Sequence, residues 1–277
     1  ADRQPVHRQI GVALEVGQRV GAPDLPLILS LCGSYYGRTQ AKYFTSLNDL
    51  LYGFDCWVAN VEFYTASSGP FGKLRVLTHL DHGQPEGDED ILEGRVEKLS
   101  SLMYDCSTLP FDENIRRTAR YVERFRDLVV VEGAVDEMFE SGTGEQKNQI
   151  TTVEHAQRFV RAAGVDIIVP NLGTEHRAAE REIRYHGEVA RALSAAVGKI
   201  LCLHGTSSLS PQDFKHLKDD GIIKVNIWTA IEKAGAQAAV RKAIEELGNT
   251  FTEADLGKLV DAGYLGPRYF EPDYRQQ

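Results

Sequence analysis

The residues VDIIV at 165–169 and ILCL at 200–203 are short, branched and apolar, and HGEVARALSAAV at 186–197 lies between them. Continuous apolar runs of this length are typical of strands that are covered on both faces. The intervening segment carries apolar residues at helical spacing. Together the three segments predict a strand–helix–strand unit with parallel strands.

The same alternation continues in both directions along the chain. Further apolar runs predict strands at 27–32, 74–80, 102–104, 128–135 and 222–227. Segments of helical period predict helices at 7–20, 47–61, 113–126, 153–163 and 231–247. No Pro- or Ser-rich linker divides the chain, so we expect one α/β domain over 1–277, with a C-terminal extension from about residue 250. The architecture that fits is a (β/α)8 TIM barrel.

Only seven strands are visible in the sequence, one fewer than a closed eight-stranded barrel needs. Either residues 1–12 supply the missing strand, or it belongs to sequence that precedes Ala1. Residues 7–20 have a helical pattern, and the chain begins without Met. We therefore expect the first strand to be missing from the numbered chain.

Composition narrows the class of protein. The 277 residues include 31 Lys and Arg and 40 Asp and Glu, a net charge of −9, which argues against an unspecific nucleic-acid binder. No apolar run approaches the ~18 residues of a membrane span, and the first residues lack the layout of a signal peptide. The four cysteines are widely spaced. They are typical of reduced thiols in a cytoplasmic protein.

Histidines follow three of the predicted strands. His82 comes after the run at 74–80, His176 after 165–169 and His204 directly after 200–203. Functional groups of a parallel barrel gather at the C-terminal ends of its strands, so we expect these imidazoles at one mouth. Three imidazoles leave one position open on a tetrahedral zinc ion, which is typical of a catalytic site. The alternative is that each histidine bonds only a nearby backbone group.

Polar residues beside these histidines suggest further roles. Asp81 precedes His82, and the two can face one site only if the strand ends there, because neighbouring strand residues point to opposite faces. A carboxylate at this position suits a general acid/base, or simply a turn or cap. Asn226 and Thr229 follow the last strand and suit substrate hydroxyl or phosphate oxygens. The 205–208 loop and the backbone amides after Trp228 suit a phosphate.

Taken in order, these segments resemble the class II, zinc-dependent ketose-bisphosphate aldolases that act on fructose or tagatose bisphosphates. The similarity runs from about residue 26 to residue 245. It rests on HLDHG at 79–83, LMYDCSTLPFDENIRRT at 102–118, VVVEGAV at 129–135, GVDIIVPNLGTEH at 164–176, LCLHGTSS at 201–208 and GIIKVNIWT at 221–229. Each segment alone is common, but the six in series are specific for the fold and the metal site.

The resemblance implies a metal site and an acid–base residue. His82, His176 and His204 correspond to the ligands of one Zn²⁺ ion, and Asp81 to the residue that handles the proton of the substrate's C4 hydroxyl. Zinc would polarise the ketone of a ketose phosphate-like substrate and stabilise the enediolate that forms when the C3–C4 bond breaks. The acidic positions that the family places near the metal are Asp105 and Glu132.

The resemblance also implies a substrate pocket. The positions that hold the donor and its phosphate are Gly205, Ser207, Asn226 and Thr229. The proton-abstracting glutamate of the family lies on a flexible loop, where Glu145 is its counterpart and Glu140 the alternative. Arg177 stands where the family has glycine. It could bind a phosphate or carboxylate itself, or block the usual donor.

Two further departures lie close to the expected metal. Ala134 replaces the second glutamate of the family's Glu-x-Glu motif, which helps to hold a second or displaced metal position, so we expect one zinc site. Trp228 replaces an aspartate between Asn226 and Thr229. With Arg177, these changes predict an altered donor or acceptor pocket.

These observations favour a metal-dependent aldolase, a carbon–carbon lyase of a specialised pathway. One alternative uses the same enolate chemistry for epimerisation, isomerisation or decarboxylation, and another is a non-catalytic aldolase-like binding protein. We expect the protein to bind a sugar phosphate or a related anion as its substrate. We expect it to bind neither nucleic acid nor a membrane. The resemblance and an aromatic tail also predict a homo-oligomer. The tail residues are Tyr264, Tyr269, Phe270 and Tyr274.

Overall fold

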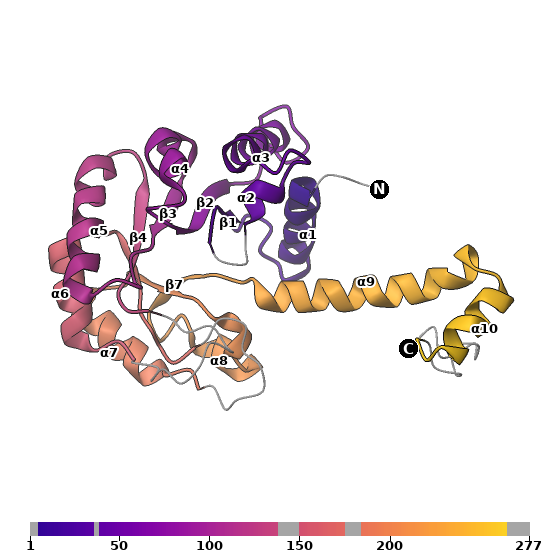
Figure 1. The fold of residues 1–277 in the computed structure, drawn as a ribbon. Coiled ribbons are helices and arrows are strands. Elements are labelled where there is room, and N and C mark those ends of the chain that lie inside the picture. The colour runs from indigo at the N-terminus through magenta and orange to yellow at the C-terminus, as the bar shows by residue number, and fades with distance from the viewer. Residues whose placement is uncertain (1–4, 36–38, 138–149, 175–183, 265–277) are drawn as a thin grey trace.

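The computed structural model describes residues 5–35, 39–137, 150–174 and 184–264. In this part of the chain seven parallel strands form one sheet, and they follow one another in space as they do in sequence (Figure 1). The strands are β1 (Leu27–Cys32), β2 (Val76–Gly83), β3 (Ser101–Tyr104), β4 (Val130–Ala134), β5 (Ile167–Val169), β6 (Leu201–Leu203) and β7 (Ile222–Val225). Every strand predicted from an apolar run is therefore present, and the parallel organisation is confirmed.

Helices connect these strands. The α-helices are α1 (Pro5–Arg19), α2 (Gln40–Tyr43), α3 (Leu50–Thr65), α4 (Glu89–Gly94), α5 (Phe111–Phe125), α6 (Val153–Ala163), α7 (Gly187–Val197), α8 (Pro211–His216), α9 (Thr229–Thr250) and α10 (Glu253–Asp261), and two 3-10 turns are η1 (Val96–Lys98) and η2 (Thr206–Ser208). Local sequence sets their ends. The Thr152 side chain caps α6 by accepting from His155 N, and Gly164 ends that helix with φ 69°.

The expected closure of the barrel is not confirmed. Among the described residues β1 and β7 are the two edges of the sheet, because β1 pairs with β2 and β7 with β6. Residues 5–19 form helix α1, as their pattern predicted, so they do not supply an eighth strand. The described chain thus forms a curled sheet of seven parallel strands that is TIM-barrel-like, with β1 and β7 as its unpaired edges among the described residues.

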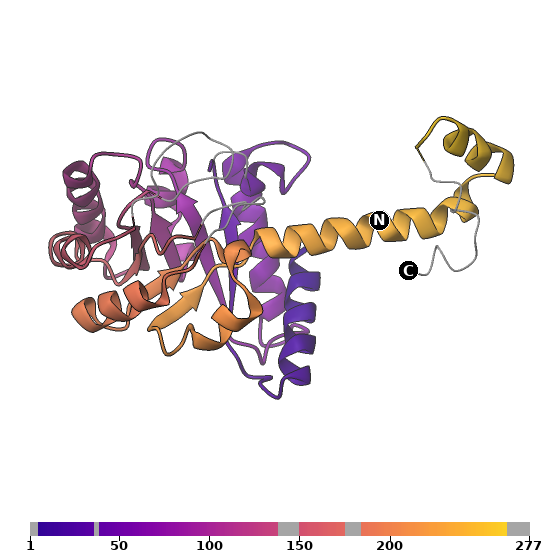
Figure 2. The same ribbon diagram turned by 90° about the horizontal axis from the view of Figure 1, so that it is seen from below.

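The sheet has two different faces. Helices α3, α5, α6 and α7 cover its outer face, and the main core lies between them and the strands (Figures 1 and 2). That core includes Phe54, Trp57, Val131, Phe159 and Leu193. Strand alternation turns a second, smaller set of apolar residues to the inner face: Met103, Ala134, Val169 and Cys202. The inner face also carries buried charged groups, which form the candidate site.

Helix α9 leaves the sheet. It runs outwards from the end of β7 and carries α10 at its far end, away from the other elements in both views (Figures 1 and 2). Side chains along it are exposed, including Ile231 in its first turn at 64% and Val240 in its middle at 59%. This helix therefore has little of its surface buried within one chain.

Candidate metal centre and acid–base site

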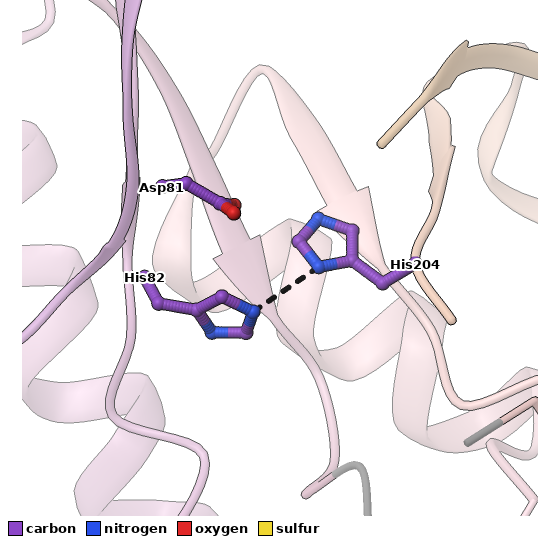
Figure 3. A group of neighbouring side chains, drawn as sticks. All are labelled: Asp81, His82 and His204. Carbon is purple, nitrogen blue, oxygen red and sulfur yellow. Dashed lines mark hydrogen bonds between the residues drawn. The ribbon is translucent and has the colours of Figure 1, made fainter. Parts of the chain in front are cut away.

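Asp81 and His82 both face the inside of the barrel, although they are neighbours on β2. The pairing of β2 with β3 is irregular between Leu80 and Gly83, and His82 has φ 50°, in the left-handed region. This irregularity breaks the normal alternation of side chains. The strand does not end at Asp81, as the sequence argument required, but the bulge has the same effect. Ligand atoms of Asp81, His82 and His204 lie within 4.8 Å of one another (Figure 3).

The two histidines are arranged as metal ligands would be. His82 Nε2 and His204 Nδ1 lie 3.3 Å apart, and both side chains are buried (Figure 3). Two ligands on a tetrahedral zinc ion, with Zn–N bonds of about 2.0–2.1 Å, are separated by about 3.4 Å. The donors and their spacing therefore fit a zinc ion.

Asp105 binds the Nδ1 atom of His82, on the side of the ring away from His204. Its Oδ2 lies 2.6 Å from His82 Nδ1, while Ser107 donates to Oδ1 through its hydroxyl, at 2.7 Å, and through its backbone N–H. Burial alone would raise the pKa of Asp105, but the hydrogen bond and charge of His82, with the bonds from Ser107, lower it to about 2. A carboxylate at Nδ1 keeps that nitrogen protonated and leaves Nε2 to face the metal.

An aromatic ring from the end of β1 covers the same imidazole. Tyr35 stacks on His82 with ring centroids 4.2 Å apart and an angle of 17° between the planes. Tyr35 was not among the residues predicted from sequence. It could have been predicted as a site residue from its position just after the first strand, because the site histidines also follow strands.

Asp81 is held by Asn226. Asn226 Nδ2 donates to Asp81 Oδ1 at 2.9 Å, and the Cys32 thiol lies 3.7 Å from Oδ2. Asn226 in turn accepts from Lys224 Nζ at 2.8 Å. The sequence predicted Asn226 as a substrate-binding residue, and the structure places its amide on the expected acid–base residue.

Lys224 is a buried cation that the sequence analysis did not single out as a site residue. Its ammonium forms an ion pair with Glu132 Oε1 at 2.7 Å and lies 3.3 Å from His79 Nε2. Burial alone would lower the pKa of Lys224, but Cys202 and Glu132 raise it above its usual range. Lys224 pairs with Cys202 of the inner face, and a register shift separates this pair from Ile222, which packs in the main core with Leu201. The available signal was a lysine inside an otherwise apolar strand.

Glu132 also belongs to a second group of potential ligands, with Cys202 and His204, whose ligand atoms lie within 4.8 Å of one another. Burial raises the pKa of the Cys202 thiol well above its usual range. The ammonium of Lys224 already neutralises Glu132. Ala134, two residues further along β4, packs into the inner apolar cluster and offers no ligand. These features favour the group around His82 for a cation.

The loops after β6 and β7 lie together. Thr206 Oγ1 donates to the carbonyl of Asn226 at 3.0 Å, and Gly205 adopts φ 68° at the turn. The Ser207 hydroxyl is buried and has no hydrogen-bond partner among the described residues. Thr229 begins the 22-residue helix α9, whose N-cap makes no side-chain capping bond. A helix N-terminus of this kind suits an anion.

Several predicted site residues cannot be placed. His176, Arg177, Glu140 and Glu145 lie outside the described residues. The chain that leads towards His176 does start beside the site, since Thr174 Oγ1 donates to the carbonyl of His204 at 2.8 Å.

The fold and site define a parallel α/β, barrel-like protein with a pair of histidines that could hold a metal ion and a carboxylate beside them. The chain belongs to the class II fructose-bisphosphate aldolase family, whose sequence model matches residues 26–264.

Curated relatives share limited identity. YdjI of Escherichia coli K12, described as uncharacterized, is 33% identical over 171 residues, 60% of this chain and 60% of YdjI. Fructose-bisphosphate aldolase of Staphylococcus epidermidis RP62A is 30% identical over 202 residues, 70% of this chain and 65% of that protein. The chain therefore spans less than two thirds of the length of these relatives.

Solved structures show the same fold. The crystal structure of the YdjI aldolase from Escherichia coli K12 matches 83% of this chain and 74% of that chain, with TM-score 0.62 and 27% identity. Fructose-bisphosphate aldolase from Campylobacter jejuni matches 87% of this chain and 74% of that chain, with TM-score 0.67 and 20% identity. At this low identity the match shows a shared fold and nothing more. In the part of the chain that the structure describes, no helix is both long and apolar enough to cross a membrane.

Proposed function

We propose that the protein is a metal-dependent aldolase that cleaves or forms a ketose phosphate-like substrate in a specialised pathway. The observation that carries this proposal is the pair of buried imidazole nitrogens, 3.3 Å apart, with the Asp81 carboxylate beside them. His82 and His204 would hold one Zn²⁺ ion, with His176 as the third ligand expected from the family. When bound, zinc supplies Lewis-acid polarisation of the substrate carbonyl and stabilises the charge that develops on oxygen.

In the cleavage direction, Asp81 accepts the proton of the hydroxyl on C4. The C3–C4 bond then breaks, its electrons move towards the carbonyl, and the aldehyde leaves. A proton must next be delivered to C3, a role that we assign to Glu145. In the condensation direction these transfers reverse, and Asp81 returns its proton to the new hydroxyl.

A phosphate of the substrate fits the loops after β6 and β7. The buried Ser207 hydroxyl, the 205–208 backbone and the N-terminus of α9 at Thr229 offer donors there. Arg177 would add a positive charge near these donors. The net charge of −9 makes such local donors necessary for an anionic substrate.

We propose further that an eighth strand between the edges of β1 and β7 closes the barrel. Both edge strands have the parallel direction that a closing strand would extend. The four cysteines form no disulfide bond in the described part of the chain, which supports a reducing, cytoplasmic location.

We also propose a homo-oligomer in which α9 packs against a second copy. This 22-residue helix, about 33 Å long, lacks within one chain the tertiary packing from which helices in proteins gain most of their stability. Its residues Ala236, Val240, Ala243 and Leu247 follow the four-three-four spacing of a helix–helix seam.

The charged residues of α9 lie mostly away from this seam. Lys242 forms ion pairs with Glu245 and Glu246 along the same helix, which leaves the apolar line of Ala236, Val240, Ala243 and Leu247 to face a partner. A second copy presents the same apolar line, so two copies can pair about a two-fold axis.

The experiment for the catalytic proposal is cleavage of fructose and tagatose 1,6-bisphosphates and related ketose phosphates, before and after chelation. We expect activity that is lost with the metal, restored by Zn²⁺ and abolished in Asp81→Asn. Activity that survives both treatments would contradict the proposal. Deuterium exchange into the substrate without cleavage would instead indicate an epimerase or isomerase, and absence of stoichiometric zinc a binding protein.

A further inference from the structure

Four polar side chains, of which three are buried and Asn226 is half-buried, form a continuous chain across the inner face of the sheet. Glu132 on β4 pairs with Lys224 on β7, Lys224 donates to Asn226 Oδ1, and Asn226 Nδ2 donates to Asp81 on β2. The three contacts are 2.7, 2.8 and 2.9 Å long. Glu132 is fully buried, and Asp81 and Lys224 are less than one-tenth exposed.

The two ends of the Asn226 amide face partners of opposite kind. An ammonium group can only donate and a carboxylate can only accept, whereas an amide does both. Lys224 therefore requires the amide oxygen on its side, and Asp81 receives the NH₂ group. Asp81 favours the same orientation, but only Lys224 holds the opposite end of the amide with a short, charge-assisted bond, since the Cys202 thiol lies 3.7 Å from Asn226 Oδ1. Without Lys224 the amide loses this anchor and can move away from Asp81.

The surroundings of Lys224 keep its ammonium in this place. Glu132 and Cys202 approach it from β4 and β6, His79 from β2 and Asn226 from the loop after β7. Glu132 forms an ion pair with it and Asn226 accepts a hydrogen bond from it, so its position is fixed from two sides. No contact of Lys224 involves His82 or His204 among those that the structure describes.

We propose that Lys224 is a positioning residue, which fixes the orientation of the Asn226 amide and so holds Asp81 by Oδ1, leaving Oδ2 for the proton of the substrate. The inference rests on the proposed aldolase activity. Lys224 itself does not reach the reacting atoms. Its effect belongs to the step in which Asp81 takes up or returns a proton, and binding of the metal or substrate should change little.

The test removes both charges of the ion pair together, because Lys224→Met alone would leave Glu132 buried and unpaired. In Lys224→Met/Glu132→Gln we expect kcat to fall by about 10–100-fold, as for other small misplacements of a reacting group, while KM stays within about twofold. Zinc content should be unchanged. Ile223→Ala, on the exposed side of the same strand, is the matched control and should keep the wild-type kcat.

A double-mutant cycle separates positioning from a general structural effect. If Lys224 acts through Asn226, adding Lys224→Met/Glu132→Gln to Asn226→Ala should cost no further activity. Losses that multiply, or a double variant that folds and keeps the wild-type kcat, would overturn the inference.

A second readout does not depend on activity. The side-chain NH₂ protons of Asn226 should exchange slowly in the wild-type NMR spectrum, compared with those of exposed Asn249, and rapidly in Lys224→Met/Glu132→Gln. Fast exchange in the wild type would overturn the inference even if the double variant fails to fold. Absence of aldol cleavage with slow wild-type exchange would refute the catalytic proposal and leave the Asn226 geometry supported.

Discussion

Asp105 acts on the candidate metal through the far nitrogen of His82. We expect Asp105→Asn to weaken zinc binding by about 10–100-fold, because the amide is uncharged and does not hold the Nδ1 proton as a carboxylate does. Competition with a chromophoric chelator measures the affinity. Asp112→Asn, at an exposed position of α5, is the control and should bind zinc as the wild type does. Equal affinities in the two variants would show that Asp105 does not support the metal site.

His79 makes the stability of the metal-free protein depend on pH. Burial lowers the pKa of His79 to about 4, from an ordinary value of 6.5, with Lys224 lowering it further and Glu132 opposing. Between these values the unfolded chain binds a proton that the folded chain does not. The free energy of unfolding should therefore fall by about 3 kcal/mol as the pH falls from 6.5 to 4.

Urea unfolding across this pH range measures the loss, with His79→Gln as the comparison. The variant should lack this part of the pH dependence. Asp105 contributes in a lower window, since its pKa is lowered from 3.8 to about 2, and its stabilisation is lost only as the pH falls through that range. An identical pH slope above pH 4 in both proteins would be the contrary result.

At the scale of elements, apolar runs and helical periodicity predicted the strands and long helices. Strand β1 and helix α6 have the predicted bounds. Strand β2 continues beyond its apolar run to Gly83, because backbone pairing does not depend on side-chain polarity. The short segments α2, α4, η1, η2 and α8 were missed, since one turn carries no period to detect.

The site was predictable where a residue follows a strand. His82, His204 and Asp81 were found in this way and are close together. The bulge at His82 was not predictable, because histidine carries no marker of a positive φ. Lys224 was missed because it stands inside an apolar run, and its long side chain reaches partners that are distant in sequence.

Helix α3 packs against α2 at Gly53. A Cβ atom added there would lie 1.9 Å from the carbonyl oxygen of Ala41, a backbone atom that cannot move without shifting α2. We expect Gly53→Ala to lower the free energy of unfolding by about 1–3 kcal/mol. Gly94→Ala is the control, since its Cβ would meet no atom within 4 Å. Urea unfolding measures both, and equal stabilities would contradict the close packing of α2 on α3.

At the scale of the whole molecule, the barrel-like body and helix α9 have different sources of stability. The body buries a continuous core under its outer helices. Most of α9 has no such cover within one chain (Figures 1 and 2). Loss of a partner from α9 should therefore leave the barrel-like body and its candidate site folded. Association and folding can be tested separately.

A single charge on α9 tests its role in association. Val240 lies within the proposed seam and is 59% exposed, so Val240→Glu should leave folding of the body intact but place a carboxylate in the apolar contact between the two copies. We expect the wild type to sediment as a dimer or larger assembly and the variant to shift towards the monomer. Val153→Glu, at a partly exposed position of α6, should not shift the mass. A wild-type monomer, or a variant with unchanged mass, would refute the α9 interface while leaving the site unaffected.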